Sequence, residues 1–226
     1  MVELVTSAAP ADDAATLLSR WLTDVHEARG GARLGIAGGS AAAAFARLQA
    51  KLPARVWRAL KLTWVDERVV PVSSDDSNRG ALERAGALSR PPGLVLPLVL
   101  DGEDGAAACA RFSKAFADQF GGALDVALLG MGEDGHVASL FPGHRLLGAT
   151  TTVAHLEDSP KPPRARVTLT LPVLSREGLR RLVLAAGAGK RAALKRLAAH
   201  DVSVPVSRLG SLTVMTDQPL DLMEKT

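Results

Sequence analysis

The stretch "LDVALLGMGEDGHVASLFPG" (residues 124–143) places an apolar run directly before the most polar, glycine-rich loop of the chain. The run at 124–130 has the composition of a buried β-strand. The loop at 130–143 carries two acidic residues and one histidine among several glycines. In an open parallel sheet, ligands bind outside the carboxyl ends of the strands. This junction therefore makes the loop the first candidate for the wall of a binding cleft.

The order of strand, turn and helix recurs on both sides of this stretch. Predicted strands occupy residues 33–37, 60–67, 93–100, 179–187 and 211–217, and the segment 165–175 is predicted to be a strand that runs into a turn. Predicted helices occupy 11–28, 40–49, 77–86, 103–120 and 188–199. Pro97 indicates an edge or a break in the strand at 93–100. Alternating strands and helices predict an α/β fold, with a doubly wound, mostly parallel sheet and helices on both faces.

The length of 226 residues and an apolar content of 47% predict one large domain, 1–226. No apolar run is long enough to span a membrane, and the first residues lack the pattern of a signal peptide. A lone Cys109 excludes an intramolecular disulfide and a cysteine-based zinc site. These features predict a cytoplasmic protein that is a monomer or a small homo-oligomer.

The net charge of +3 comes from scattered lysines and arginines rather than from one basic patch. The chain has no tyrosine, and its few Phe and Trp residues are not interleaved with basic ones, as a base-stacking surface would need. We therefore expect no nucleic-acid or membrane partner. A few well-placed cations suit a small anionic substrate better.

The segment GIAGGSAAAAF (35–45) is a strand, a glycine turn and a helix. Gly38 and Gly39 allow close approach to an anion, free amides of the helix bind phosphate, and Ser40 adds a hydroxyl. The alternative is an ordinary turn in which Ser40 caps the helix. The motif alone does not separate the two interpretations, and it matches neither a P-loop nor a dinucleotide fingerprint.

The segment WVDERVVPVSSDDSN (64–78) puts Asp66, Glu67 and Arg68 at the end of a predicted strand. In a functional interpretation Asp66 and Arg68 face the cleft. Taken alone, three consecutive charges are more typical of a solvated strand exit. The residues SDDSN are expected to form a turn and cap a helix.

His136 is the strongest candidate for a catalytic residue, because its ordinary pKa suits a general base near neutral pH. Asp134 is placed to hold the imidazole or an attacking water. The loop glycines, among them Gly132 and Gly135, are expected to bring backbone N–H groups to a developing oxyanion. An exposed histidine in a flexible loop is the alternative, but the glycines and acids at a strand end favour function.

Arg166 and Lys190 are candidate phosphate ligands, and each is alternatively an ordinary surface cation. Lys190 begins a predicted helix after a glycine turn, where a cation opposes the helix dipole. A bound anion would remove that penalty. No spacing of histidines or acids indicates a metal site.

Taken together, these segments resemble the 6-phosphogluconolactonase family. The matching pieces are GIAGGS, WVDERVV with DSN, LLGMGEDGHVASLFPG, RVTLTLP and GAGK, in the family's order from about residue 34 to 190. The resemblance implies a doubly wound domain with a small appended lobe. One departure is Ala41-Ala42, where the family commonly has Thr-Pro after the GGS; it places more of the phosphate binding on Ser40, Arg166 and Lys190.

The related glucosamine-6-phosphate deaminases share the motifs DER and GxGxDGH with this chain. After the histidine their sequences look like IAFNEPG, a segment that includes a catalytic glutamate. This chain reads VASLFPG, with Ser139, Leu140 and Phe141 and no acid. The lactonase version is thus favoured over an amino-sugar-phosphate deaminase or isomerase. A non-catalytic phosphosugar sensor is the other alternative, but residues 1–33 hold one predicted helix and too little room for a helix-turn-helix.

The resemblance implies that the substrate is a phosphorylated sugar lactone, 6-phospho-D-glucono-1,5-lactone. In this hypothesis His136 activates water, Asp134 or Asp66 orients it, and glycine amides with Arg68 stabilise the oxyanion. The phosphate is held by Gly38, Gly39, Ser40, Arg166 and Lys190. The expected hydrolysis needs no redox, metal or nucleotide cofactor.

Overall fold

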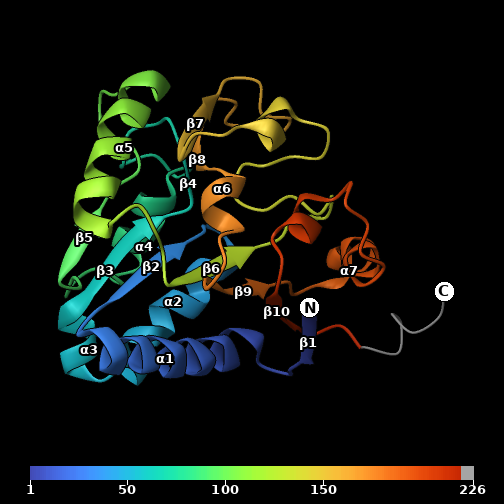
Figure 1. Cartoon of the computed structure of the whole chain (residues 1–226), viewed down its shortest axis with the longest axis horizontal. Helices are drawn as coiled ribbons and strands as arrows, with labels where there is room; N and C mark the ends of the chain where they lie inside the picture. The colour runs from blue at the N-terminus through green and yellow to red at the C-terminus, as the bar shows by residue number, and fades with distance from the viewer. Residues whose placement is uncertain (220–226) are drawn as a thin grey trace.

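The computed structural model describes residues 1–219, built around a seven-stranded sheet (Figure 1). Every neighbouring pair of strands in this sheet is parallel. In spatial order the strands are β1 (Val2–Thr6), β10 (Leu212–Thr216), β9 (Arg180–Leu184), β6 (Val126–Gly130), β2 (Ala32–Ile36), β3 (Leu60–Trp64) and β5 (Leu94–Leu96). The predicted parallel sheet is confirmed. Residues 220–226 of the predicted domain 1–226 lie outside the described residues, and that boundary stays a prediction.

The central strand β6 is apolar on both faces, because helices and loops cover both. Its first four residues, 126–129, are fully buried. The short strand β5 lies at one edge of the sheet and ends just before Pro97, as the proline predicts.

The helices pack on the two sides of this sheet. Figure 1 shows α1 and α3 along one side and α5 on the other, and α1 also packs closely against α2. The helices are α1 (Pro10–Arg29), α2 (Ser40–Lys51), α3 (Ala54–Ala59), α4 (Asn78–Arg84), α5 (Gly105–Phe120), α6 (Leu171–Leu174) and α7 (Arg191–Ala198); three 3₁₀ turns are η1 (Arg145–Gly148), η2 (Ala188–Lys190) and η3 (Pro205–Arg208). No helix within residues 1–219 is long and apolar enough to cross a membrane.

A second, antiparallel sheet forms the small lobe and has the order β4 (Asp66–Arg68), β8 (Arg166–Leu169), β7 (Val153–Leu156). The single strand predicted at 60–67 is wrong, since the chain changes sheets at Val65. The amide of Val65 bonds Ile36 in the main sheet, while its carbonyl accepts from Leu169 in the small one. The strand exit is thereby covered by the lobe.

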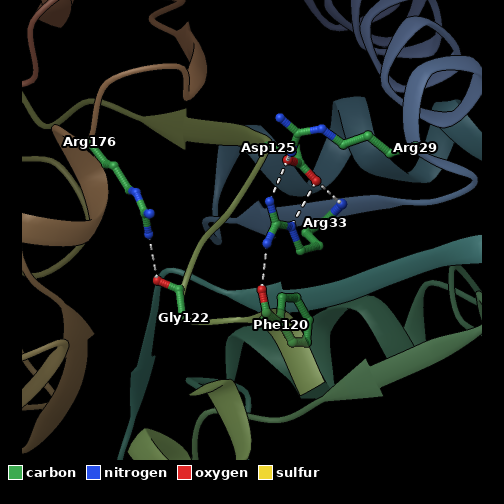
Figure 2. Close-up of polar contacts among 6 residues, drawn as sticks. All are labelled: Arg29, Arg33, Phe120, Gly122, Asp125 and Arg176. Carbon is green, nitrogen blue, oxygen red and sulfur yellow. Dashed lines mark hydrogen bonds and ion pairs between the residues drawn. The ribbon is translucent and has the colours of Figure 1, made fainter. Parts of the chain in front are cut away.

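An ion-pair cluster joins β2 and β6 at their amino ends (Figure 2). Asp125, just before β6, accepts hydrogen bonds from Nε and Nη2 of Arg33 at 2.9 and 2.7 Å, and from Nη1 of Arg29 at 2.7 Å. Nη1 of Arg33 also donates to the carbonyl of Phe120 at 2.7 Å. These contacts tie together the two strands whose opposite, carboxyl ends carry the GGS turn and the histidine loop.

Candidate active site

The loops that follow β2, β3, β6 and β9 meet around a cavity of about 450 Å³ at the carboxyl ends of the strands. This is the position that the strand–loop order predicts. Polar and glycine residues in its wall are Gly38, Gly39, Ser40, Asp66, Arg68, Asn78, Gly130, Gly132, Glu133, His136, Lys161, Arg166 and Lys190. The predicted site residues are therefore gathered at one cavity, with the exceptions of Asp134 and Gly135.

Asp134 contacts the cavity through His136. Its Oδ1 lies 2.6 Å from Nδ1 of His136. A carboxylate only accepts hydrogen bonds, so Nδ1 of the imidazole carries the proton in this pair. In the neutral imidazole, Nε2 is then left with the lone pair that a general base requires.

The glycines of this loop shape it rather than offer donors to a ligand. The amide of Gly132 donates to the carbonyl of His136, and the amide of Gly135 donates to that of Gly132. A Cβ at position 132 would lie 2.0 Å from Nδ1 of His136, so only glycine fits beside the imidazole. Gly135 has a φ of 81° and packs against Val204, outside the cavity wall. The expected oxyanion donors at 132 and 135 are thus already engaged.

The ring of His136 is mostly buried, with the centroid of the Phe141 ring 4.7 Å from its own. Burial lowers the pKa of His136 below its ordinary value of 6.5; the nearby Asp134 and Asp66 oppose this effect, and the charge of Lys161 reinforces it. Burial works against ionisation of Asp134, but the hydrogen bonds and charge of His136 and the charge of Lys161 together outweigh it and keep the pKa of Asp134 below its usual value.

Asp66 and Glu67 are not a solvated strand exit, as the interpretation of this segment alone favoured. Asp66 is 5% exposed, and its Oδ2 accepts a hydrogen bond from Oγ of Ser139 at 2.8 Å. Arg68 lines the cavity; its Nη1 donates to the carbonyl of Asp76, and its buried Nε has no partner among the described residues. The small sheet covers this segment because β4 pairs with β8. The sequence of residues 64–78 does not indicate this pairing.

Glu67 holds the strand exit against the start of α4. Its carboxylate accepts the backbone N–H groups of Arg68, Asn78 and Arg79 at 2.7–2.8 Å and the hydroxyl of Ser77 at 3.3 Å. Burial raises the pKa of Glu67, and the three amides act in the opposite direction. The carboxylate fixes the backbones that present Arg68 and Asn78 to the cavity.

The polar segment before α4 caps that helix, as predicted. Oγ of Ser77 accepts the amide of Gly80 at 2.9 Å, while Nδ2 of Asn78 donates to the carbonyl of Asp66. Asn78 was not among the predicted site residues. Its place after SDDS marks it as a residue at a helix start, and DSN is one of the pieces of the resemblance, but neither signal assigns it a role at the cavity. The cavity wall it forms depends on the packing of α4 beside β4.

The GGS turn presents the start of α2 to the cavity. Gly39, with φ 60°, precedes the helix and has no side chain to cap it, so the alternative of Ser40 as the cap is wrong. A Cβ at Gly38 would lie 1.9 Å from Oδ1 of Asn78. The amide of Ala42 donates to the carbonyl of Gly39 at 3.1 Å. The amides of Ser40 and Ala41 have no partner within residues 1–219 and are available for an anion at the cavity that Ser40 and Lys190 line.

Arg166 lines the cavity, but most of its donors are used within the protein. Its Nε donates to the carbonyl of Pro163, and its Nη2 donates to those of Lys161 and Pro162, at 2.9–3.1 Å. Nη1 lies 3.5 Å from Oγ of Ser139. Arg166, 4% exposed, thus holds the loop between β7 and β8 more than it faces a ligand.

Lys161 is a cavity residue that the sequence interpretation missed. It lies between Ser159 and the prolines in the loop that Arg166 holds, and no periodicity or motif position distinguished it from the scattered surface lysines. Within residues 1–219, no group of three or more His, Cys, Asp or Glu residues is arranged to hold a metal ion. Cys109 is half-buried against the core, away from this cavity, and burial raises its pKa to about 11.

Comparison with known proteins is consistent with this geometry. A family model described as glucosamine-6-phosphate isomerases/6-phosphogluconolactonase matches residues 6–216. A rat protein named 6-phosphogluconolactonase is 41% identical over 180 residues, covering 75% of this chain and 69% of its own. A rice protein named probable 6-phosphogluconolactonase 3, chloroplastic, is 34% identical over 224 residues, covering 84% of this chain. The match spans 65% of the rice protein's length.

A solved structure shares the fold. The crystal structure of 6-phosphogluconolactonase from Thermotoga maritima superposes with a TM-score of 0.82 and 24% sequence identity, covering 96% of this chain and 98% of its own. The parallel sheet with its small antiparallel lobe is therefore a known architecture.

Proposed function

The chain belongs to the family of glucosamine-6-phosphate isomerases and 6-phosphogluconolactonases, and on that premise we propose that it hydrolyses 6-phospho-D-glucono-1,5-lactone to 6-phospho-D-gluconate. The observation that carries the proposal is the surroundings of His136. Its imidazole is held by Asp134 and packed against Phe141. In the resembling deaminase sequence IAFNEPG, the position of Phe141 holds a glutamate, whereas here an apolar ring fills it. A single base with an apolar neighbour suits lactone hydrolysis.

The proposed reaction starts at Nε2 of His136. This nitrogen takes a proton from water while the water oxygen forms a bond to C1, and the carbonyl π electrons move to the carbonyl oxygen. When the tetrahedral intermediate collapses, the bond between C1 and the ring oxygen breaks. The ring oxygen receives the proton from His136, which is neutral again, and the open-chain acid then ionises. Asp134 keeps the imidazole in the required tautomer through both steps.

The phosphate end of the substrate is assigned to the start of α2 and to Lys190. Ser40 and the first amides of α2 supply hydrogen-bond donors, and Lys190 supplies charge at the same cavity. Binding energy from this remote group fixes the lactone carbonyl near His136. Arg68 lines the same cavity and stays a candidate for the oxyanion, and Asp66 orients either the water or a sugar hydroxyl.

The replacement His136→Ala tests the proposal. Loss of a general base typically lowers the rate by about 10²–10⁴-fold. Turnover of the phosphorylated lactone is measured above its spontaneous hydrolysis, with ammonia release from glucosamine 6-phosphate assayed in parallel. Near wild-type lactonase turnover in the variant, or ammonia release by the wild-type protein, would contradict the assignment.

The replacement Lys190→Ala tests the phosphate end separately. We expect a weaker binding of the phosphorylated lactone and a smaller preference for it over plain glucono-1,5-lactone. An unchanged preference would remove Lys190 from the phosphate site. We also propose that the protein is a monomer or a small homo-oligomer, which light scattering measures. Its proposed cytoplasmic location is tested by cell fractionation.

A further inference from the structure

The loop between β7 and β8 brings Lys161 to the catalytic end of the cavity. Nζ of Lys161 lies 3.9 Å from Oδ1 of Asp134, the same oxygen that contacts His136. That separation is too long for a hydrogen bond. The Lys161 side chain is 47% exposed, and among residues 1–219 its ammonium group has no closer acidic neighbour. Its N–H donors are therefore open to a ligand.

The backbone of Lys161 is fixed although its side chain is free. Its carbonyl accepts from Nη2 of Arg166 at 3.0 Å and from Oγ of Ser159 at 2.8 Å, and its amide donates to Oγ of Ser159 at 3.3 Å. Arg166 is itself buried and holds the next two carbonyls of the same loop. The small lobe thus presents the ammonium group of Lys161 to the cavity from a rigid support, in addition to Arg68 and Arg166.

We propose that Lys161 is a catalytic residue for the lactone hydrolysis proposed above, with its ammonium group donating to the carbonyl oxygen of C1 as negative charge develops there. The inference rests on that proposed function. The two loop amides that the glycines were expected to offer to this charge, those of Gly132 and Gly135, are engaged in bonds inside the loop. A cation placed beforehand beside the base stabilises such an oxyanion.

The other cations of the cavity are less suited to this task. Arg166 directs most of its donors at loop carbonyls. Arg68 uses one donor for the carbonyl of Asp76, and within residues 1–219 it forms no ion pair with Asp134, whereas Lys161 does. Lys190 follows β9, and the last residue of β9, Leu184, accepts from Oγ of Ser40 at 3.5 Å, so Lys190 follows the strand that contacts the start of α2 assigned to the phosphate. Lys161 is the cation that adjoins the Asp134–His136 pair.

A pH profile gives a readout that a purely structural lysine would not change. The charged groups that face His136 are Asp134 on its own loop, Asp66 on β4 and Lys161 on the β7–β8 loop, while Cζ of Arg166 lies 5.7 Å from the ring centroid of Phe141. Burial is the main cause of the low pKa of His136, and Lys161 lowers it further. Removing that charge moves the acid limb of kcat/KM to higher pH.

The test compares Lys161→Gln and Lys161→Arg with the control Lys114→Gln, an exposed lysine on α5. For Lys161→Gln we expect kcat to fall by about 10²-fold, with KM and inhibition by inorganic phosphate little changed. The acid limb shifts upward, and Lys161→Arg recovers part of kcat. Lys114→Gln resembles the wild-type protein in all these measurements.

Three results would overturn the inference: an unchanged kcat in Lys161→Gln, a raised KM with weakened inhibition by inorganic phosphate, or a lower kcat without a shifted acid limb. The second result would assign Lys161 to the phosphate. Wild-type turnover decides the proposed function independently. An inactive wild-type protein rejects the function, whereas an active one with an unimpaired Lys161→Gln variant rejects only the role of Lys161.

Discussion

Oδ1 of Asp134 lies 2.6 Å from Nδ1 of His136, two residues further along the same loop. The sharp turn between them depends on Gly135, whose φ of 81° is unfavourable for other residues. The carboxylate fixes which imidazole nitrogen carries the proton, and it opposes the effect of burial on the imidazole pKa. The contact between Asp134 and His136 therefore affects where the imidazole of the proposed base lies, which tautomer it adopts and how basic it is.

Asp134→Asn is expected to lower kcat by about 10²–10⁴-fold. The amide of asparagine can donate to Nδ1, which would place the imidazole proton on Nε2, where it prevents uptake of a proton from water. Steady-state lactonase assays measure the effect. Asp118→Asn, on the exposed side of α5, is the matched control and should keep wild-type kcat. A kcat within twofold of wild type in Asp134→Asn would remove Asp134 from the mechanism.

The pH dependence of kcat/KM is expected to show an acid limb with its midpoint below 6.5, the ordinary pKa of histidine. Only neutral His136 accepts a proton from water, so activity falls as pH drops through its pKa. Burial lowers that pKa and extends activity toward acid. The rates are corrected for spontaneous hydrolysis at each pH. A midpoint above 6.5 would contradict the assignment of the acid limb to the buried imidazole of His136.

Phe141→Leu is expected to shift this acid limb upward. The Phe141 ring packs on the imidazole of His136, and Cζ of Arg166 lies 5.7 Å from the ring centroid. A smaller side chain admits water to the imidazole, which raises its pKa, and lowers the free energy of unfolding by about 1–2 kcal/mol. Phe112→Leu, in the buried stack with Phe116, should destabilise similarly without moving the limb. A shift in both variants, or in neither, would contradict the explanation.

Much of the fold follows from local patterns in the sequence. The apolar run at 124–130 contains β6, and the GGS turn at 38–40 follows the neighbouring parallel strand β2, as the alternation of strands and helices predicts. The His136 loop is predictable because its glycines, acids and histidine are contiguous. Strand β1 and helix α3 are absent from the predicted elements; β1 is a half-exposed edge strand without a clear alternation of burial.

The rest of the site arises from contacts between segments distant in the sequence. Asp66 and Glu67 appear solvated in the strand pattern, but β8 pairs with them from a hundred residues away. Lys161 reaches the cavity only because Arg166 holds its loop. Arg166 is a predicted phosphate ligand because a cation suits an anion. In the fold, its guanidinium donates to backbone carbonyls of residues 161–163, and the sequence does not show that the loop brings these carbonyls to it.

Glu67→Gln is expected to lower both stability and activity. The carboxylate accepts hydrogen bonds from three backbone amides and one hydroxyl. In glutamine, an NH₂ group replaces one of the two acceptor oxygens, so the donors on that side lose their acceptor. Leaving buried groups unsatisfied costs about 1–3 kcal/mol of unfolding free energy, measured by urea denaturation. The lactone KM rises because Arg68 and Asn78 lose their common support.

Glu83→Gln is the matched control for Glu67→Gln, because Glu83 pairs with Arg79 on the more exposed side of α4. Such a surface pair contributes about 0.5 kcal/mol or less. Equal destabilisation of the two variants would show that Glu67 is not the anchor of the strand exit. An unchanged KM in Glu67→Gln would show that Arg68 and Asn78 do not depend on it.

Asp125→Asn is expected to lower the free energy of unfolding by about 2–4 kcal/mol and to leave kcat of the folded protein unchanged. Asp125 joins β2 and β6 through Arg33, at the strand ends opposite the cavity (Figure 2). Asp24→Asn removes the exposed pair with Arg180 and should change stability by about 0.5 kcal/mol or less.

The effect of Asp125→Asn should also depend on pH. Burial works to raise the pKa of Asp125, but Arg33 outweighs it and holds this pKa below the ordinary 3.8. A carboxylate with a depressed pKa stabilises the fold fully above its unfolded pKa and loses that effect as pH falls through its folded pKa. The difference between wild type and variant in urea denaturation should therefore be constant near neutral pH and shrink below 3.8. A difference that grows in acid would mean that Arg33 does not stabilise the ionised carboxylate.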